Sequence, residues 1–440
     1  MPPPEPEPVI PSSRLVLLAA VLVAACRGAA PGGELPPPAA APSDTTCLIA
    51  TGRTTPRDTV TVALTEPVDP AHAPVPYNVA ERFVFAQLYE TLIRVDCQGR
   101  VLPALARSWG QGAAGRWTIT LRADARFWDG APVTARDVLA AWRTRDASTA
   151  QAITILDDRT LGIDPSGLAF QRFADPALAV TKSAPGGGWP IGTGNHWTTG
   201  AAAAGEALWA SPVPGAALPA IKMAVTTASD ARDAIDGNVD VLLTSDPAAL
   251  EYARTRSGYQ DVPLEWDHTY VLLAPEGSGL DVGALRLESL PQAVHVDARP
   301  AQADDGRFWF ADLKRCGLPA EPASPTVPPR RRVVYEQADR DARDLAARLV
   351  GLAAFGRGAV VAGLARAAFE PAFRGGTEAA YVLRVRRRTA DACAAARQLP
   401  AWVLRGSITP LIDTRTHLLA RRGLPRLSLD WDGAVRLVAR

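Results

Sequence analysis

The stretch Trp117–Arg143 reads WTITLRADARFWDGAPVTARDVLAAWR and decides the fold of this chain. Its first residues alternate apolar and polar side chains, which predicts a strand, and Asp129-Gly130 predicts a turn. Thr134 is the expected N-cap of a helix, with Asp137 three residues later to complete a capping box. Apolar residues then follow at helical spacing, at Val138, Leu139 and Trp142. The stretch is predicted to form a strand, a turn and an amphipathic helix.

Several other segments accompany this block: TVTVAL at 59–64, an expected helix at 79–92, VLPALARSW at 101–109, PIGTG at 190–194 and a helix-turn-strand pattern at 234–242. Together they resemble family 5 of the extracellular solute-binding proteins, the substrate-binding lipoproteins of peptide- and nickel-type ABC importers. Asn195 and His196 stand where the family has Pro-Tyr. The resemblance is specific over about 59–272 and weaker over 332–440.

The resemblance implies an α/β fold of the periplasmic-binding-protein type, with two lobes and a discontinuous first lobe. Residues 277–330 are weakly periodic where family members carry a larger second lobe, so the second lobe is expected to be reduced. The expected parts are a signal peptide at 1–26, a disordered tether at 27–47, the first part of lobe I at 48–272, lobe II at 273–399 and a returning segment of lobe I at 400–440.

The N-terminus carries a targeting signal. Leu15–Ala25 is apolar but too short to span a bilayer. Val23-Ala24-Ala25-Cys26 resembles a lipobox, which implies cleavage and acylation of Cys26. The alternative is an ordinary secretory signal with Cys26 incidental. The Pro-rich residues 28–46 have almost nothing to bury and suit a tether. We expect an extracytoplasmic, lipid-anchored protein.

Four further cysteines remain, at Cys47, Cys97, Cys316 and Cys393. An even number in an exported protein favours disulfides, and three pairings are possible. We prefer Cys47–Cys97 and Cys316–Cys393, because each pair joins residues assigned to one lobe. The alternative is that some of these cysteines remain buried thiols.

Composition and motifs argue against several function classes. The formal charge of +1 offers no electrostatic basis for a nucleic-acid partner. Common nucleophile, zinc, phosphate and dinucleotide motifs are absent from the sequence. His295 and Asp297 could place two metal ligands on one side of a strand, but two such residues also occur by chance. We therefore expect a protein that is not an enzyme, with no cofactor and no metal.

A solute-binding cleft is expected to use aromatic faces and a few placed polar groups. Candidates were sought among aromatics in loops or near the expected crossings between lobes: Tyr77, Trp197, Trp266, Tyr270 and Trp402. Each has an alternative role in the core. A peptide's charged ends would need carboxylate and guanidinium partners, for which Arg384, Arg386 and Asp413 lie in suitable regions. His196 neighbours the loop expected to line the cleft, but we interpret it as a surface loop residue.

The sequence thus favours a monomeric solute-binding lipoprotein that takes a peptide or peptide-like small molecule to an ABC permease, closing two lobes about a hinge. The main alternative is an envelope lipoprotein of the same descent that has lost transport and serves as a scaffold or sensor. An extracytoplasmic hydrolase is a third possibility, supported only by the export signal.

Overall fold

The computed structural model describes residues 47–49, 57–112, 115–164, 170–200, 207–225, 230–281, 285–302, 308–316, 330–356, 358–387 and 392–438. The expected signal peptide, the lipidation site at Cys26 and nearly all of the expected tether lie outside these residues. Within them, every helix is too short or too polar to cross a membrane.

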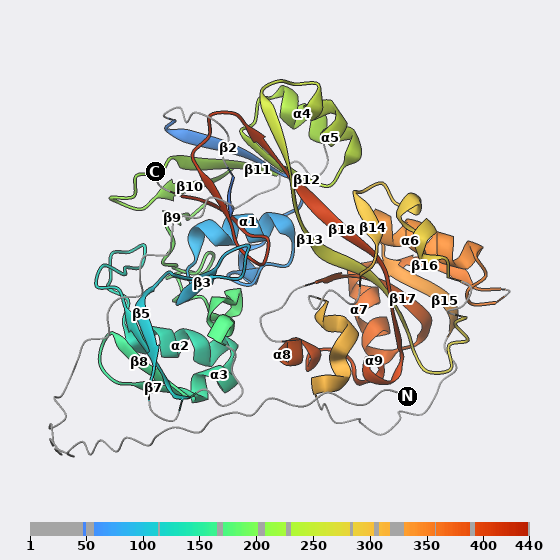
Figure 1. The fold of residues 1–440 in the computed structure, drawn as a ribbon, viewed down its shortest axis with the longest axis horizontal. Coiled ribbons are helices and arrows are strands. Elements are labelled where there is room, and N and C mark those ends of the chain that lie inside the picture. Colours follow the sequence, from blue (N-terminus) through green and yellow to red (C-terminus); the bar gives the residue numbers. More distant parts are fainter. Residues whose placement is uncertain are drawn as a thin grey trace, which may run out of the picture. The chain divides into compact units, whose positions relative to one another are not determined.

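A mixed β-sheet forms the frame of the fold (Figure 1). Its strand order among the described residues is β16-β15-β17-β13-β18-β12-β2-β11-β10-β9, and β14 pairs with β18 beside this path. On the first-lobe side the strands are β2 (Thr59–Leu64), β9 (His196–Trp197), β10 (Leu208–Pro212), β11 (Ala220–Val225) and β12 (Val241–Thr244). On the second-lobe side they are β14 (Ala298–Pro300), β15 (Arg330–Glu336), β16 (Val360–Leu364) and β17 (Glu378–Arg386).

Two long antiparallel strands, β13 (Tyr259–Ala274) and β18 (Ser407–Arg421), join the two sides. The C-terminal half of β13 pairs with β17, where Leu273 faces Tyr381. The last residues of β18 pair with β12, where Ala420 faces Val241. The chain therefore passes to the second lobe along β13 and returns along β18. Residues 267–273, near the expected crossing between the lobes, lie within β13.

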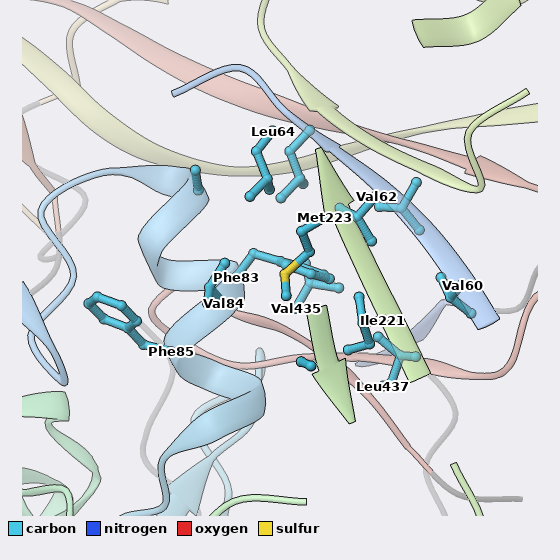
Figure 2. Close-up of a cluster of buried hydrophobic side chains, with 14 of the residues drawn as sticks. Val60, Val62, Leu64, Phe83, Val84, Phe85, Ile221, Met223, Val435 and Leu437 are labelled. Carbon is cyan, nitrogen blue, oxygen red and sulfur yellow. The ribbon is translucent and has the colours of Figure 1, made fainter. Parts of the chain in front are cut away.

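The first-lobe core lies where α1 (Val79–Leu88) packs on β2 and β11 (Figure 2). Alternate residues of both strands, such as Val62 and Met223, are buried against this helix. Figure 2 shows that Phe85 points away from the sheet residues. On the opposite face of the sheet, α4 (Ala231–Asp236) and α5 (Pro247–Arg254) cover a smaller core around Leu242 and Leu419.

Helix α1 ends at Leu88, four residues before the predicted end at Leu92. The Leu88 carbonyl accepts from the backbone N–H of Gly194, at 3.0 Å, in place of a helical partner. A Cβ on Gly194 would lie 2.4 Å from the Gln87 carbonyl oxygen, and one on Gly192 would lie 2.3 Å from that of Leu88. The glycines of the PIGTG segment are therefore required for the close approach of two backbones.

The stretch Trp117–Arg143 contributes to a second core within the first-lobe portion. Its strands, in the order β5-β6-β8-β7, are β5 (Ala106–Gln111), β6 (Trp117–Leu121), β7 (Ile153–Ile155) and β8 (Thr160–Ile163). They pack with α2 (Ala135–Arg145) and α3 (Ala147–Gln151). The capping box of Thr134 and Asp137 is present at the start of α2. Trp142 is fully buried, and its Nε1–H donates to the Leu178 carbonyl at 2.8 Å.

The second-lobe core surrounds β15, β16 and β17, which run parallel to one another. Its helices are α6 (Arg340–Gly351), α7 (Arg366–Gly375), α8 (Ala392–Ala396) and α9 (Ala401–Arg405). Parallel strands joined by helices are the arrangement that an α/β lobe requires. The N-cap of helix α6 is Asp339, whose carboxylate accepts from the Ala342 N–H at 2.9 Å.

The remaining strands are β1 (Leu48–Ile49), β3 (Ile93–Val95), β4 (Val101–Pro103), β19 (Leu427–Leu429) and β20 (Val435–Leu437). The last two form a C-terminal hairpin around Asp432-Gly433, with Gly433 at φ +83°. The structure contains the disulfides Cys47–Cys97 and Cys316–Cys393, the same pairs that the sequence analysis preferred.

Candidate functional site

A short loop before α1 organises the candidate site. This proline loop (residues 69–77) is held by Glu81 in the first turn of α1, where a carboxylate is favoured by the helix N-terminus. The buried Glu81 carboxylate accepts from the N–H of Asp69 at 3.0 Å and from the N–H of Tyr77 at 2.6 Å, and it contacts His72 Nδ1 at 2.7 Å. The loop is thus fixed to α1 at three points.

The proline loop and the adjoining Glu66 also meet the second lobe. The Arg366 guanidinium, at the start of α7, lies 4.0 Å from the ring centroid of Tyr77. Arg384 on β17 forms an ion pair with Glu66 at 3.2 Å. Two positions along, Arg386 donates to the Pro76 carbonyl at 3.4 Å. These contacts join the two lobes in this structure.

A pocket lies directly behind the proline loop. It is lined by Pro74 and Pro76, by one face of α1, by residues 174–179 and by the hairpin residues 430–436. Its volume is about 460 Å³, including space that opens to solvent. Phe85 on α1, Tyr89 directly after it and Trp431 on the hairpin contribute aromatic surface, while arginine and aspartate side chains contribute charged surface. Such a site suits a small solute with an apolar body.

Arg82 is the buried cation of this pocket, with only 3% of its side chain exposed. Its Nη1 donates to Asp267 Oδ2 at 3.0 Å and to the Asp432 carbonyl at 2.8 Å. Burial acts to raise the pKa of Asp267, but His268 and Arg82 hold that pKa well below its usual range. Burial lowers the pKa of Arg386 to about 10, and the charge of Arg82 acts in the same direction. The pocket is thus lined by a buried cation, with further buried ionised groups just beyond it.

The structure does not bring the five predicted aromatic ligand residues into one site. Tyr77 is exposed beside Arg366, as described above. Trp197 lies on the edge strand β9 and is 37% exposed. Two guanidinium groups, of Arg299 and Arg415, lie over the ring of Trp266. Of these three positions, only Tyr77 lies on the proline loop.

Tyr270 and Trp402 are packed in the second lobe. Tyr270 is 1% exposed, and its hydroxyl donates to Asp339 at 2.9 Å. Trp402 lies on α9, donates to the Phe373 carbonyl at 2.6 Å and packs against Tyr381. Because α9 packs on the second-lobe core, the chain returns to the first lobe along β18, not at residue 400 as we expected. These positions favour a core role for both residues.

Two further expectations are corrected by the structure. His196 is fully buried and not a surface loop residue, with Nε2 2.9 Å from the Pro219 carbonyl oxygen. Asp413, considered as a partner for a peptide amine, is fully buried and already accepts from Arg387 and Thr269. Neither side chain is available to a solute.

His295 and Asp297 were considered above as a possible pair of metal ligands, but the Asp297 carboxylate already has partners within the protein. Asp297 accepts from Arg415 at 2.6 Å and contacts His417 at 3.0 Å. The described residues contain no group of three or more side chains suited to hold a metal ion.

Arg82, Glu81 and Asp267 were not among the predicted site residues. Arg82 and Glu81 were part of an expected helix with no chemical signal of their own. The adjacent charges Glu81-Arg82 in a largely apolar helix were the available signal, since charges on a buried helix are rarely without partners.

Comparison with known proteins gives one family. Residues 100–183 match the model described as bacterial extracellular solute-binding proteins, family 5 middle. The periplasmic oligopeptide-binding protein OppA of Escherichia coli K12 is 35% identical over 119 residues, covering 24% of this chain and 22% of OppA. The nickel-binding periplasmic protein of the same organism is 37% identical over 76 residues, covering 17% of this chain and 14% of the relative. The sequence matches thus span less than a quarter of these relatives.

The fold matches extend much further. The structure of the Escherichia coli murein tripeptide binding protein MppA matches with a TM-score of 0.61 at 14% identity, over 88% of this chain and 100% of MppA. The structural matches confirm the predicted two-lobed α/β fold, and the sequence match over residues 100–183 confirms the predicted resemblance to family 5. Family 5 proteins are binding proteins and not enzymes, in agreement with the expectation from the motifs.

Proposed function

We propose that this family 5 solute-binding protein binds a peptide or peptide-like small molecule between its two lobes, outside the cytoplasm, and delivers it to an ABC permease. The observation that carries the proposal is the double role of the proline loop. Its buried prolines line the pocket, while Tyr77 and the Pro76 carbonyl contact the second lobe. A solute in the pocket would therefore contact the same loop that joins the two lobes.

The relatives support the solute class. OppA is named for oligopeptides and MppA for a murein tripeptide, and both names describe periplasmic proteins. The nickel-binding relative leaves a metal complex as a second solute class. The pocket favours the peptide class, because both aromatic and charged side chains line it and no group of three or more potential metal ligands occurs among the described side chains. A lipid anchor at Cys26 and a monomeric state complete the proposal.

Closure would follow from contacts that a solute adds to both lobes. A ligand stabilises the closed form only by its greater affinity for that form. Tyr77 presents an exposed ring next to Arg366, so a solute at the loop could contact one residue from each lobe. This arrangement needs no cofactor and no covalent step.

Thermal unfolding of the full chain with pools of di- to pentapeptides tests the proposal. A solute that binds only the folded protein raises its stability by about 2.7 kcal/mol at a hundred times its Kd. We expect a rise in Tm with some pool, reduced by Tyr77→Ala. Trp209→Ala is the matched control, since this exposed aromatic lies on β10 beside Lys222 and away from the proline loop. No rise with any pool would favour the scaffold or sensor alternative.

A further inference from the structure

One edge of the Arg82 guanidinium is buried without a partner. Nη1 makes both of the hydrogen bonds described above, to Asp267 and Asp432. Nε and Nη2 are buried and find no hydrogen-bond acceptor among the described residues. Buried donors of a charged group are almost always satisfied, because an unpaired one loses its hydration without compensation. This pair of donors therefore points to a ligand.

The chemistry of the edge selects the ligand. Nε–H and one N–H of Nη2 are parallel and match the two oxygens of a carboxylate. The same chain shows this pairing elsewhere: Arg332 donates from Nε to one oxygen of Glu378, at 2.9 Å, and from Nη2 to the other. At Arg82 the corresponding acceptor is missing.

The other charges lining the pocket are already engaged. The Asp430 carboxylate accepts from both Arg94 and Arg436. The Asp432 side chain accepts from the Ala434 N–H at 3.1 Å. Three arginines thus line the pocket with two aspartates, Asp430 and Asp432, leaving an excess of one positive charge when all are ionised.

Charged side chains just beyond the pocket lining would also act on an anion bound in the pocket. Arg386 acts on the same region, and its pKa is lowered in part by repulsion from Arg82. Asp267 pairs with Arg82 through Oδ2, and its buried Oδ1 has no hydrogen-bond donor among the described residues. Asp175 is paired with Arg172 at 2.7 Å. An anion at the empty edge would relieve the repulsion between the two arginines.

We propose that the pocket behind the proline loop is a carboxylate subsite, in which Nε and Nη2 of Arg82 hold both oxygens of a ligand carboxylate. The inference rests on the proposed function and names the chemistry of the solute: one carboxylate on a compact apolar or aromatic body. That body would lie against Phe85, Tyr89 and the two prolines of the loop. The carboxylate belongs either to a small carboxylic acid or to the C-terminus of a short peptide.

Isothermal titration calorimetry of the full chain with four probes tests the subsite. The probes are 3-phenylpropionate, 3-phenylpropanamide, the dipeptide Ala-Phe and its C-terminal amide. We expect at least one carboxylate probe to bind about 10- to 100-fold more tightly than its matched amide, the usual contribution of charge-assisted hydrogen bonds. Tight binding of only one carboxylate probe identifies the source of the carboxylate.

Three variants locate the effect. Arg82→Lys keeps a positive charge beside Asp267 but lacks the two-donor edge, so it should abolish the preference for carboxylate over amide. Ala174→Leu fills the pocket from a half-buried position without touching Arg82, and should weaken both carboxylate probes even if Arg82→Lys is poorly folded. Arg232→Lys is the control, because that arginine grips the exposed Asp230 with the same atoms. It should bind all probes as the original chain does.

A second readout reports on Arg82 itself. In ¹⁵N-labelled protein the Nε–H resonance of Arg82, assigned by its loss in Arg82→Lys, should move downfield when a carboxylate probe is added. Equal affinities for acids and amides, or binding that Arg82→Lys leaves unchanged, would overturn the subsite. If peptide pools still raise Tm, the proposed function survives that result; if no probe or pool binds, both proposals fail.

Discussion

Replacing the buried aspartate of the crossing strands should destabilise the protein strongly. Asp413 on β18 is fully buried and receives four donors. Thr269 Oγ1 and Arg387 donate to one oxygen, and Arg299 Nε at 3.1 Å and the Gln302 N–H at 3.2 Å donate to the other. This carboxylate therefore ties both crossing strands and the end of β17 to one point.

The magnitude follows from the donors that lose their acceptor. In Asp413→Asn one oxygen becomes an NH₂ group, so two of the four donors face another donor. The charge of Arg387, whose side chain is 1% exposed, is then left without its carboxylate. Breaking a buried pair in this way costs about 3–5 kcal/mol. We expect the free energy of unfolding to fall by about that amount.

Urea denaturation followed by circular dichroism measures the change, and amide hydrogen exchange of β17 and β18 locates it. Asp344→Asn is the matched control, since its pair with Arg343 is exposed and worth about 0.2–1 kcal/mol. The double replacement Asp413→Leu with Arg387→Met should recover much of the loss, because it leaves no fully buried charge unpaired, while Arg299 is partly exposed to water. If Asp413→Asn costs no more than the control, the argument for this network is wrong.

Three further predictions concern the rest of the fold. Gly192→Ala should lower the unfolding free energy by more than about 2 kcal/mol in urea titrations, because a Cβ would lie 2.3 Å from the Leu88 carbonyl oxygen. Surface substitutions typically change the unfolding free energy by roughly ±0.5 kcal/mol. A change for Gly192→Ala below about 0.5 kcal/mol would therefore contradict the prediction. Replacing Cys316 and Cys393 by alanine should cost up to about 4 kcal/mol, from a sequence separation of 77 residues, and an unchanged Tm would refute it. Burial lowers the pKa of His196, so its contribution to stability is complete above the unfolded value of about 6.5 and is lost as the pH falls toward the folded value. Urea midpoints at pH 7.5, 6 and 5 should therefore fall less steeply in His196→Gln than in the original chain; parallel curves would exclude this role.

Local patterns predicted the elements well. The strand, the capping box of Thr134 and Asp137, and the helix that follows all occur where the sequence placed them. Each depends on hydrogen bonds or φ values within a few residues. The end of α1 did not follow from local pattern, because the backbone of Gly194, more than a hundred residues later, takes the Leu88 carbonyl.

The candidate site was harder to predict. Aromatic residues near expected crossings were reasonable ligand candidates, but Tyr270 and Trp402 satisfy their polar atoms inside the second lobe. The adjacent charges Glu81-Arg82 indicated buried partners but not which ones, since the role of Arg82 depends on Asp267 and on the C-terminal hairpin. Of the predicted aromatics, Tyr77 lies on the loop that lines the pocket and contacts the other lobe; ligand contact by any of the five stays a prediction.

The order of strands and helices, the caps, the turn glycines and the family resemblance were determined by the amino-acid sequence alone, because they depend on neighbours within a few residues or on the spacing of short motifs. Only the tertiary structure decided which charges meet and which are left without an acceptor. The Arg82 edge and the buried Asp413 network each combine residues more than a hundred positions apart, and the free energy of a buried charge depends on those distant partners rather than on its neighbours in the chain.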